Sequence, residues 1–389
     1  MENIEIIGAG YIGLPLAAAF SRYCSVILVE KDDIRLKKLR EGTFIYGEKD
    51  VDELLCLNAA RIRFESKPLP CANVIVAVQT PTYENGSPDV SYVQNAVDDI
   101  LPLMDKESLL VLESTVPVGT CKAIKEHVDA KGYQGHFAYC PETILPGNVL
   151  AEIRGNARVI GSDDEVALFL AKNLYRQITG ADIDVCGFEE AELVKLLQNA
   201  SRDVNLAFAN QVAAIAIKEG VDPFSLIEKI NKHPRVQVLR PGSGVGGHCI
   251  AVDPLFLIDR YGENASLLRT ARFINDQKPR DVAKEVDGLC EDLEDTICVL
   301  GLAYKPDIGD VRNSRGLAIC RRLMEDGYSV IGCEPNAALP VIAGVMNLSI
   351  EEALARAKVF VIAQGHRAFL PYRSQIKERA HVDPCGFLR

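Results

Sequence analysis

The feature that most constrains the fold of this chain lies near its amino terminus, where a short apolar run leads into a turn with three glycines. Ile4 to Ile7 predicts a β-strand, and Leu14 to Arg22 predicts a helix. Gly8, Gly10 and Gly13 follow the strand in the spacing Gly-x-Gly-x-x-Gly. The first glycine permits a tight turn, the second lets a pyrophosphate approach the backbone, and the third lets helix and strand pack closely. The segment predicts a dinucleotide-binding unit with the diphosphate at the helix N-terminus; the alternative is a glycine-rich turn without a ligand.

A carboxylate after the second predicted strand indicates which dinucleotide binds. Val26 to Val29 predicts that strand, and Glu30 follows it. A carboxylate here accepts hydrogen bonds from ribose hydroxyls and repels a 2′-phosphate, so we expect NAD rather than NADP. Tyr11 and Ile12 lie within the glycine turn, and Thr80 follows a later apolar run. We expect all three to contact the cofactor.

Strands and helices alternate in two separate parts of the sequence. The first third of the chain and the part after Thr296 both have this alternation, which is typical of parallel sheets covered by helices. Between them, Glu189 to Gly220 predicts one long helix, of the kind that links domains or forms a dimer seam. We predict an α/β protein with two Rossmann-like doubly wound domains joined by a central helical dimerisation region, divided at residues 1–187, 188–288 and 289–389. The further strands predicted are Val74 to Val78, Leu109 to Leu112, His136 to Tyr139, Ile297 to Leu300, Ser329 to Cys333 and Val359 to Ala363, and the further helices are Asp33 to Glu41, Gly316 to Glu325 and Ile350 to Arg356.

Composition excludes several classes of function. A length of 389 residues requires two or three domains, and a net charge of -11 argues against a nucleic acid or an anionic membrane as the main partner. No apolar run reaches the roughly 18 residues of a transmembrane helix, and the first residues form no signal peptide, so we expect a cytoplasmic protein. The twelve cysteines include no Cys-x-x-Cys pair; we expect most to be reduced packing residues, and we expect no metal site.

One cysteine differs from that expectation by its context. Cys249 follows a run of glycines in the segment Gly242 to Pro254, and Asp253 comes four residues after it. A cysteine thiolate attacks an aldehyde, loss of hydride gives a thioester, and water cleaves the thioester to an acid. Asp253 would position that water or assist the proton transfer. Packing is the alternative for any cysteine, and His248 is interpreted as structural rather than as a base.

The long predicted helix carries two polar residues with the spacing of one helical turn. Lys195 and Asn199 are four residues apart, so they share one face. A lysine here could stabilise an alkoxide, and the asparagine could bind the same oxygen or a water. From the sequence alone, a solvated lysine on an amphipathic helix is the favoured interpretation.

Taken together, these blocks resemble the UDP-glucose/GDP-mannose dehydrogenase family over nearly the whole chain. The resemblance implies an NAD domain, a helical dimerisation region and a second Rossmann-like domain that binds a UDP-sugar. It also implies a two-step oxidation, in which the C6 alcohol of a sugar becomes a carboxylate while two NAD are reduced, in polysaccharide biosynthesis. The matching blocks are Gly8-x-Gly10-x-x-Gly13, Glu113-Ser-Thr115-Val-Pro, Pro141-Glu142, Lys195-Leu-Leu-Gln-Asn199, Gly246-Gly-His-Cys249-Ile-Ala-Val-Asp253-Pro, Gly301-Leu-Ala-Tyr-Lys305-Pro and Asp310-Val-Arg312-Asn-Ser314.

The resemblance also implies roles for single residues. Cys249 is similar to the family's nucleophile, and Lys195 to its charge-stabilising lysine, with Asn199 beside it. Asp253 and Glu142 are similar to the carboxylates that handle protons and the hydrolytic water. The implied binding residues are Thr115 near the nicotinamide and that water, Arg35 on the adenosine side, Lys305 and Arg312 as cations of the closing domain, Gly246 at the substrate, and Arg235 reaching the substrate from the partner subunit of a homodimer.

Within the family, three blocks are similar to the subgroup that oxidises UDP-N-acetyl-D-mannosamine. They are His233-Pro-Arg235-Val, the block around Cys249, and Leu268-Arg-Thr-Ala-Arg272. One departure is Thr143, which stands where that subgroup usually has arginine. The alternatives are the same reaction on UDP-GlcNAc, UDP-glucose or GDP-mannose, a two-electron hydroxyacid dehydrogenase, which would leave the cysteine block unexplained, and a non-catalytic NAD-binding scaffold.

Overall fold

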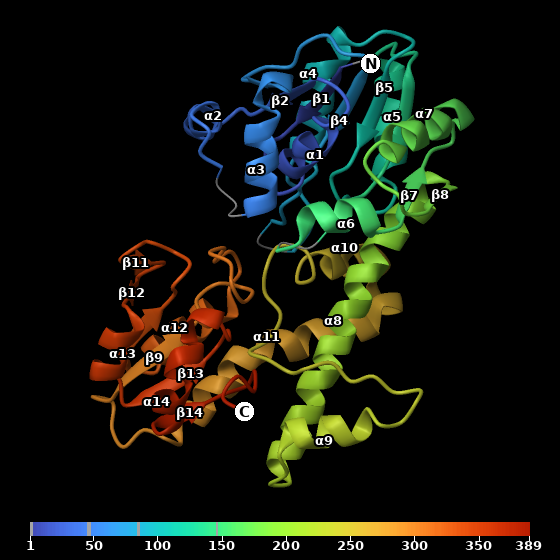
Figure 1. Ribbon diagram of the computed structural model, residues 1–389. Helices are drawn as coiled ribbons and strands as arrows, with labels where there is room; N and C mark the ends of the chain where they lie inside the picture. The colour runs from blue at the N-terminus through green and yellow to red at the C-terminus, as the bar shows by residue number, and fades with distance from the viewer. Residues whose placement is uncertain (1–2, 45–47, 84–85, 145–146) are drawn as a thin grey trace. The chain divides into compact units, whose positions relative to one another are not determined.

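A computed structural model describes residues 3–44, 48–83, 86–144 and 147–389 (Figure 1). The chain forms two compact units, Met1–Gln198 and Asn199–Arg389. The boundary falls within helix α8 (Phe188–Lys218), so this helix continues from the first unit into the second.

The first unit contains an eight-stranded sheet in the order β3-β2-β1-β4-β5-β6-β7-β8. Neighbouring strands are parallel except for β6 and β7, which pair antiparallel. The order reverses direction beside β1, as in a doubly wound dinucleotide-binding domain. The strands are β1 (Ile4–Ile7), β2 (Val26–Val29), β3 (Ile62–Glu65), β4 (Asn73–Val76), β5 (Leu109–Leu112), β6 (His136–Tyr139), β7 (Arg158–Gly161) and β8 (Ile183–Cys186).

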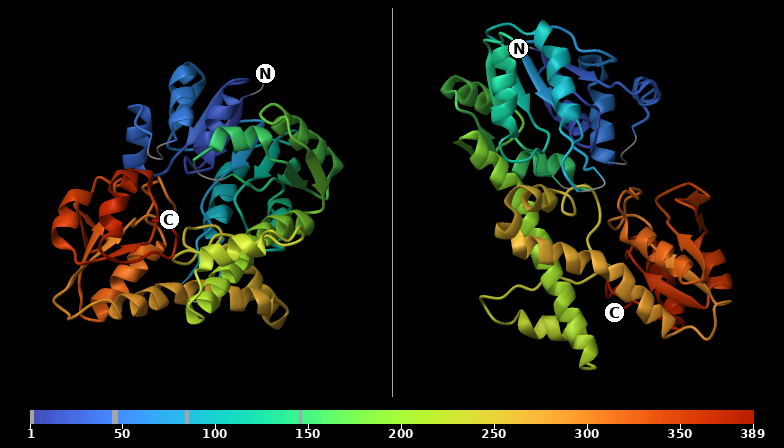
Figure 2. Two further views of the ribbon diagram at one scale, coloured as in Figure 1. Left: turned by 60° about the horizontal axis from the view of Figure 1, so that its bottom comes forward. Right: turned by 180° about the vertical axis from the view of Figure 1, so that it is seen from behind.

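Helices cover both faces of this sheet, which explains why its central strands are mostly apolar, although β1 also buries Glu5. Ile4 and Ile6 belong to the apolar core under α1 and α3, whereas Ile7 belongs to the core under α4 and α5. The views in Figures 1 and 2 show these helix pairs on opposite sides of the sheet. The helices of this unit are α1 (Gly13–Phe20), α2 (Asp33–Arg40), α3 (Lys49–Leu57), α4 (Ser91–Ile100), α5 (Thr120–Ala130), α6 (Val149–Gly155) and α7 (Glu165–Arg176), with short 3₁₀ segments at Ala59–Arg61 and Leu101–Leu103.

The second unit begins with a helical region whose helices are joined by buried polar contacts. Arg272 of α11 donates to the Asp203 carboxylate of α8 at 2.6 Å, and Asn275 donates to the same oxygen at 2.8 Å. Asn210 of α8 then donates to Asn275 at 2.9 Å and accepts the backbone N–H of Gly242 at 3.0 Å. These buried contacts pair Arg272 with Asp203, and Asn210 fixes Gly242 against the helices. The helices are α9 (Pro223–Ile230), α10 (Asp253–Tyr261) and α11 (Ser266–Asp287), with a 3₁₀ segment at Gly262–Ala265.

A six-stranded sheet in the order β11-β12-β10-β9-β13-β14 completes the second unit. Its strands are parallel except for the antiparallel pair β11 and β12. The C-terminal half of α11 and helix α12 pack on one face, and α13 and α14 pack on the other. The elements are β9 (Thr296–Leu300), α12 (Arg315–Glu325), β10 (Ser329–Cys333), β11 (Val341–Ile342), β12 (Val345–Asn347), α13 (Ile350–Arg356), β13 (Val359–Ile362), a 3₁₀ segment at Arg367–Tyr372, α14 (Arg373–Lys377) and β14 (Ala380–Val382).

The predicted fold class is confirmed: two Rossmann-like α/β folds flank a central helical region. Both sheets are parallel except at two pairings, β6 with β7 and β11 with β12. Strands β11 and β12 are joined by the short turn at Ala343 and Gly344, whereas the connection from β6 to β7 contains helix α6. Among the described residues, no helix is both long enough and apolar enough to cross a bilayer.

Candidate active site

The glycine turn between β1 and α1 has a separate steric reason for each glycine. Gly8 has a φ of +104°, and a Cβ atom on it would lie 2.6 Å from the Ala77 carbonyl oxygen. A Cβ on Gly13 would lie 1.8 Å from the Gly8 carbonyl oxygen, so only glycine lets α1 begin this close to β1. A Cβ on Gly10 would meet no atom of the described chain within 4 Å. Gly10 therefore faces open space, as the backbone must where a pyrophosphate approaches.

The carboxylate predicted to bind ribose is buried at the end of β2 and already oriented. Glu30 is 7% exposed and accepts the backbone N–H of Asp32 at 3.0 Å. Its other oxygen forms an ion pair with Arg35 of α2, also at 3.0 Å. Arg35 thus lies beside Glu30. Tyr11 and Ile12 are half-buried within the glycine turn.

A buried hydroxyl near the same sheet edge has no partner in the described part of the chain. Thr80 follows β4, and its Oγ1 atom is buried without a hydrogen-bond partner among those residues. An unpaired buried hydroxyl is costly unless a ligand or water satisfies it. Together with the open backbone at Gly10, this observation fits a bound dinucleotide at the carboxyl ends of β1, β2 and β4.

The strands β5 and β6 end in the next group of predicted site residues. Thr115 lies half-buried after β5, and Glu142 is buried after β6. One Glu142 oxygen lies 3.5 Å from Arg158 of β7, and the other accepts the backbone N–H groups of Thr143 and Ile144. These contacts hold the Glu142 carboxylate in one orientation. Thr143, the departure noted in the sequence, is half-buried beside it.

Arg158 connects Glu142 to a second buried carboxyl group. Arg158 lies 3.3 Å from Glu113, which also accepts a hydrogen bond from Tyr175. Burial raises the pKa of Glu113 to about 8, and the nearby Arg158 opposes that rise. Sequence reasoning missed Arg158 and Tyr175. The signal available for Arg158 was a charged residue at the start of a run, Val159 to Gly161, that otherwise suits a buried strand.

Helix α8 is anchored to the first sheet by a residue that sequence reasoning also missed. The Glu192 carboxylate accepts the backbone N–H groups of Gly119 at 2.6 Å and Cys121 at 2.7 Å, at the start of α5. Lys195 lies one turn further along α8 and is 8% exposed. The interpretation of Lys195 as a solvated surface lysine is therefore wrong. A buried lysine requires a functional or structural counterpart for its charge.

In the second unit, Asp253 forms hydrogen bonds with both Asn199 and Cys249. Asn199 of α8 donates to the Asp253 carboxylate at 2.6 Å, although 54 positions separate them. Asp253 begins α10 and is buried, and its backbone N–H donates to the Cys249 carbonyl at 2.9 Å. Cys249 itself is exposed in the turn before the helix. An exposed thiol four residues before an oriented buried carboxylate is suited to covalent chemistry followed by hydrolysis.

The glycines before Cys249 are required because a second loop packs against them. This second loop comprises residues 302–314, between β9 and α12, and is called the Lys305 loop below. A Cβ on Gly246 would lie 2.5 Å from the Asn313 carbonyl oxygen, and a Cβ on Gly247 would lie 2.8 Å from the Tyr304 ring. Asn313 also donates to the Gly247 carbonyl at 3.1 Å. The Cys249 segment and the Lys305 loop are thus fixed against each other.

The remaining predicted residues differ in their surroundings. His248 lies edge-on to Tyr304 and 3.9 Å from Asp310, contacts that suit the structural interpretation. Lys305 is half-buried in its loop, and Arg312 is exposed and paired with Asp310 at 2.7 Å. Arg235 is exposed in the segment after α9.

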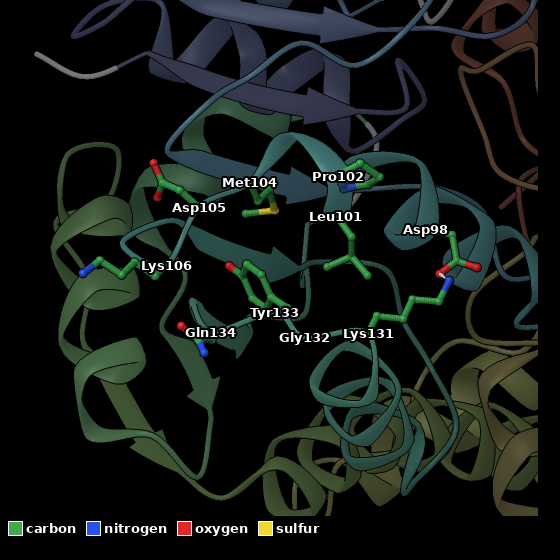
Figure 3. Close-up of a pocket in the computed structure, with 10 residues that line it drawn as sticks. All are labelled: Asp98, Leu101, Pro102, Met104, Asp105, Lys106, Lys131, Gly132, Tyr133 and Gln134. Carbon is green, nitrogen blue, oxygen red and sulfur yellow. Dashed lines mark hydrogen bonds and ion pairs between the residues drawn. The ribbon is translucent and has the colours of Figure 1, made fainter.

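A separate surface pocket of about 410 Å³ contains none of the predicted site residues (Figure 3). It lies before β5 and β6, at their amino ends, and its lining includes Tyr133, Met104 and the ion pair of Asp98 with Lys131 at 2.7 Å. Ligands of doubly wound sheets bind at the carboxyl ends instead. The candidate residues are therefore those after the strand ends in the first unit and, separately, those around Cys249 in the second unit.

Comparison with known proteins decides the family. Family models of the UDP-glucose/GDP-mannose dehydrogenase family match the NAD binding domain at residues 2–179, the central domain at 189–277 and the UDP binding domain at 298–389. The chain belongs to this family. It is therefore an NAD-dependent nucleotide-sugar dehydrogenase, which confirms the predicted enzyme class and cofactor.

Individual relatives narrow the comparison. The chain is 37% identical to the UDP-N-acetyl-D-mannosamine dehydrogenase of Escherichia coli (strain K12), over 94% of each chain. It is also 37% identical to the NDP-N-acetyl-D-galactosaminuronic acid dehydrogenase of Ralstonia nicotianae, over 99% of this chain and 96% of the relative. The structure of UDP-D-ManNAc dehydrogenase from Pyrococcus horikoshii is similar with a TM-score of 0.88 and 32% identity, covering 97% of this chain and 93% of that chain.

Proposed function

We propose that this enzyme oxidises the C6 hydroxyl group of UDP-N-acetyl-D-mannosamine to a carboxylate through a covalent intermediate on Cys249. The observation that carries the proposal is the exposed Cys249 thiol, with Asp253 buried four residues later and held by Asn199 at 2.6 Å. The overall reaction takes up one water and releases two hydrides as the alcohol becomes an acid. Bound NAD supplies the hydride acceptor for each oxidation.

The residues of the Cys249 segment carry the covalent steps. The Cys249 sulfur adds to the carbonyl carbon of the C6 aldehyde, which forms a C–S bond and leaves a thiohemiacetal. Removal of a hydride from that carbon, together with loss of the hydroxyl proton, leaves a thioester. Water then forms a C–O bond while the C–S bond breaks, which restores the thiol and releases the carboxylate. Asp253 accepts the proton of the attacking water, and its hydrogen bond from Asn199 fixes the receiving carboxylate.

Four other residues have supporting roles in this proposal. Lys195, buried on α8, stabilises the alkoxide and oxyanion that develop at C6, and Asn199 one turn later binds the same oxygen or the water. Glu142, oriented by Arg158, binds substrate and shares the handling of protons with Asp253. Thr115 lies at the end of the neighbouring strand, where it contacts the cofactor and the hydrolytic water.

The other cysteines support the choice of nucleophile. Ten of the twelve are buried or half-buried, and only Cys56 and Cys249 are exposed. Burial raises the pKa of Cys24 to about 11 and of Cys320 to about 12, so these side chains remain thiols at neutral pH. Cys56 lies on α3 and provides a matched exposed control.

The direct experiment compares two substitutions of exposed cysteines. Cys249→Ala should abolish formation of the acid while UDP-sugar binding is retained, and Cys56→Ala should leave the rate unchanged. The measurement is the uronic acid product by mass spectrometry, with UDP-sugar binding followed by calorimetry. Acid formation by Cys249→Ala at a rate close to that of the wild type would rule out the covalent route.

The choice of sugar rests on relatives and on the polar character of its N-acetyl group. Relatives named for N-acetylated sugars align over almost the whole chain, including one named for a galacto-configured acid. A site that pairs a buried amide leaves its own groups unsatisfied when the amide is missing, so UDP-glucose should be poorer by orders of magnitude. UDP-GlcNAc, the C2 epimer, is the stricter comparison, because it keeps the amide and changes only its direction. If kcat/KM for UDP-glucose or UDP-GlcNAc equals that for UDP-N-acetyl-D-mannosamine, the sugar assignment is wrong although the oxidation chemistry stands.

We also propose a homodimer formed through the central region. Leu197, Phe208 and Ile215 of α8 are all about half exposed or more. At 3.6 residues per turn, their spacings of 11 and 7 residues keep them within roughly 20° of one another around the helix. Exposed apolar residues aligned on one side of a long helix are suited to pairing with a second copy. Arg235, exposed after α9, is the residue that would reach the partner's substrate.

The remaining assignments complete the proposal. The three domains divide at residues 1–187, 188–288 and 289–389, Gly246 and Lys305 contact the UDP-sugar, and Arg312 contacts the cofactor. The enzyme acts in the cytoplasm in polysaccharide biosynthesis, as the resemblance to its family implies. Thr143 has a shorter side chain than the arginine usual in the subgroup, which leaves room beside Glu142.

A further inference from the structure

The C-terminal fold repeats the dinucleotide-binding architecture of the first unit with one large change. A Cβ on Gly316 would lie 2.4 Å from the Gly301 carbonyl oxygen, just as Gly13 lies against Gly8 in the first fold. Gly8 and Gly13 are five positions apart, whereas Gly301 and Gly316 are fifteen positions apart. The additional residues form the Lys305 loop. The short phosphate turn of the first fold is thus replaced by a long loop, which must be held in place by other contacts.

The acidic residue after β10, Glu334, has a different role from its counterpart after β2. Glu334 follows β10 as Glu30 follows β2, but it is 2% exposed and both of its oxygens are used inside the fold. One oxygen accepts the backbone N–H of Ala303 at 2.8 Å and contacts His366 Nε2 at 3.0 Å. The other accepts the backbone and side-chain N–H groups of Asn336 at 3.0 and 3.2 Å. Glu334 therefore anchors the start of the Lys305 loop.

His366 fixes the loop on the C-terminal side of Lys305. Its side chain is fully buried, and its Nδ1 atom accepts the backbone N–H of Asp307 at 2.8 Å. Asp307 has a φ of +62°, an unfavourable backbone conformation for a residue other than glycine. Its carboxylate accepts the backbone N–H and the Nε atom of Arg367, each at 2.8 Å. The backbone is thus fixed two residues before Lys305, by Glu334, and two residues after it, by His366.

The hydrogen-bond pattern assigns one tautomer to His366. The Asp307 N–H is always a donor, so Nδ1 must be the acceptor and carries no proton. The Asn336 amide nitrogen also lies 3.0 Å from Nδ1, and its orientation is set because it donates to the Glu334 carboxylate as well. The ring proton is therefore on Nε2, which donates to Glu334. His366 therefore accepts a hydrogen bond from the Lys305 loop at Nδ1 and donates one to Glu334 at Nε2.

We propose that His366 is a positioning residue for substrate binding, because its Nδ1 atom holds the Asp307 backbone and so sets the conformation of the loop that presents Lys305. This inference rests on the proposed role of Lys305 in binding the UDP-sugar. The region matched by the family's UDP binding domain includes the loop, Glu334 and His366. His366 acts through the loop and does not itself touch the substrate.

Two substitutions distinguish the contributions of the two nitrogens of His366. In His366→Asn, the side-chain oxygen can occupy the position of Nδ1 and accept the Asp307 N–H, but the contact with Glu334 is lost. In His366→Gln, the side-chain nitrogen can occupy the position of Nε2 and keep Glu334 paired, but the Asp307 N–H loses its acceptor. The proposal expects the Asn variant to bind UDP within a few-fold of the wild type and the Gln variant to bind it roughly tenfold more weakly.

The experiment is calorimetric titration of each variant with UDP, together with KM and kcat for the UDP-sugar and thermal unfolding. The Gln variant should raise KM for the UDP-sugar with little change in kcat or in KM for NAD. A merely structural role predicts the opposite order of UDP affinities. The Asn variant would then bind UDP more weakly than the Gln variant, because it leaves the buried Glu334 carboxylate without its histidine. Equal UDP affinities of the two variants, or weaker binding by the Asn variant, would overturn the inference.

A third variant distinguishes this inference from the proposal on which it rests. Lys305→Ala should weaken UDP binding whatever residue fixes the loop. If Lys305→Ala binds UDP as the wild type does, the role of Lys305 in the proposed function is wrong. If Lys305→Ala is impaired while the two His366 variants bind UDP equally, the role of Lys305 stands and the positioning role of His366 is refuted.

Discussion

Two glycine-to-alanine substitutions in the first turn should separate folding from cofactor binding. Gly13→Ala places a Cβ 1.8 Å from the Gly8 carbonyl oxygen and 3.2 Å from the Ile6 side chain. A favourable contact needs about 3.5 Å, so α1 and β1 would have to separate by roughly 1.7 Å. Gly10→Ala meets no atom of the described chain within 4 Å, and Gly10 is not among the residues with positive φ.

The expected magnitudes follow from this geometry. Overpacking of a core usually costs about 1–3 kcal/mol, and the Gly13→Ala clash with backbone belongs at the upper end. For a unit of this size, that cost lowers the melting temperature by roughly 6–12 °C. Gly10→Ala should change stability by less than about 0.5 kcal/mol. Because its methyl group enters the space of the pyrophosphate, it should weaken NAD binding at least about tenfold.

The assay is thermal unfolding of both variants without NAD, followed by titration with NAD. A control without the cofactor is essential, because bound NAD stabilises the folded state by mass action. The account expects a stability defect for Gly13→Ala and a binding defect without a stability defect for Gly10→Ala. It is refuted if Gly10→Ala binds NAD as tightly as the wild type or unfolds at the temperature of Gly13→Ala.

Three further predictions concern other parts of the molecule. Glu30→Ser should narrow the preference for NAD over NADP. The substitution removes a carboxylate and releases Arg35, which lies 3.0 Å from Glu30, to pair with a 2′-phosphate. Equal selectivity of variant and wild type in steady-state assays would contradict this prediction. Burial raises the pKa of Glu113 from 4.5 to about 8, so the unfolded state loses its proton first and the free energy of unfolding should fall as pH rises from 4.5 to 8. Glu113→Gln should reduce that fall in denaturant titrations, and an unchanged pH dependence would argue against it. Mixing inactive Arg235→Ala with inactive Cys249→Ala should restore roughly a quarter of wild-type activity through mixed dimers, and no recovery after verified subunit exchange would place Arg235 outside a shared site.

The central strands were the most predictable part of the fold. Ile4 to Ile7, Leu109 to Leu112 and Ser329 to Cys333 are strands with the predicted bounds. Each is mostly apolar because helices cover both faces of its sheet, although Glu5 interrupts the first and Ser329 begins the third. The edge strands gave no such signal: β3 and β8 carry Arg63 and Asp184 at exposed positions, since a strand near an edge can turn charged side chains to water.

Only the parts of the site that contain sequence motifs were predictable. Glycine spacing identified the turn at Gly8 and the segment before Cys249, because backbone conformation and close approach both demand glycine there. The burial of Lys195 was not predictable, since α8 packs along a length of 31 residues and no single face of it is uniformly polar. The pair Glu334 and His366 lies 32 positions apart and depends on the completed sheet, so no local pattern reveals it.

The amount of NADH formed from each sugar tests the central claim most directly. UDP-N-acetyl-D-mannosamine is supplied in limiting amount with excess NAD, and the final NADH absorbance is compared with the sugar consumed. Oxidation of the alcohol to the acid through Cys249 predicts two NADH for each sugar and one equivalent of uronic acid. One NADH for each sugar, with the aldehyde as the product, would contradict the account and leave a simple two-electron dehydrogenase.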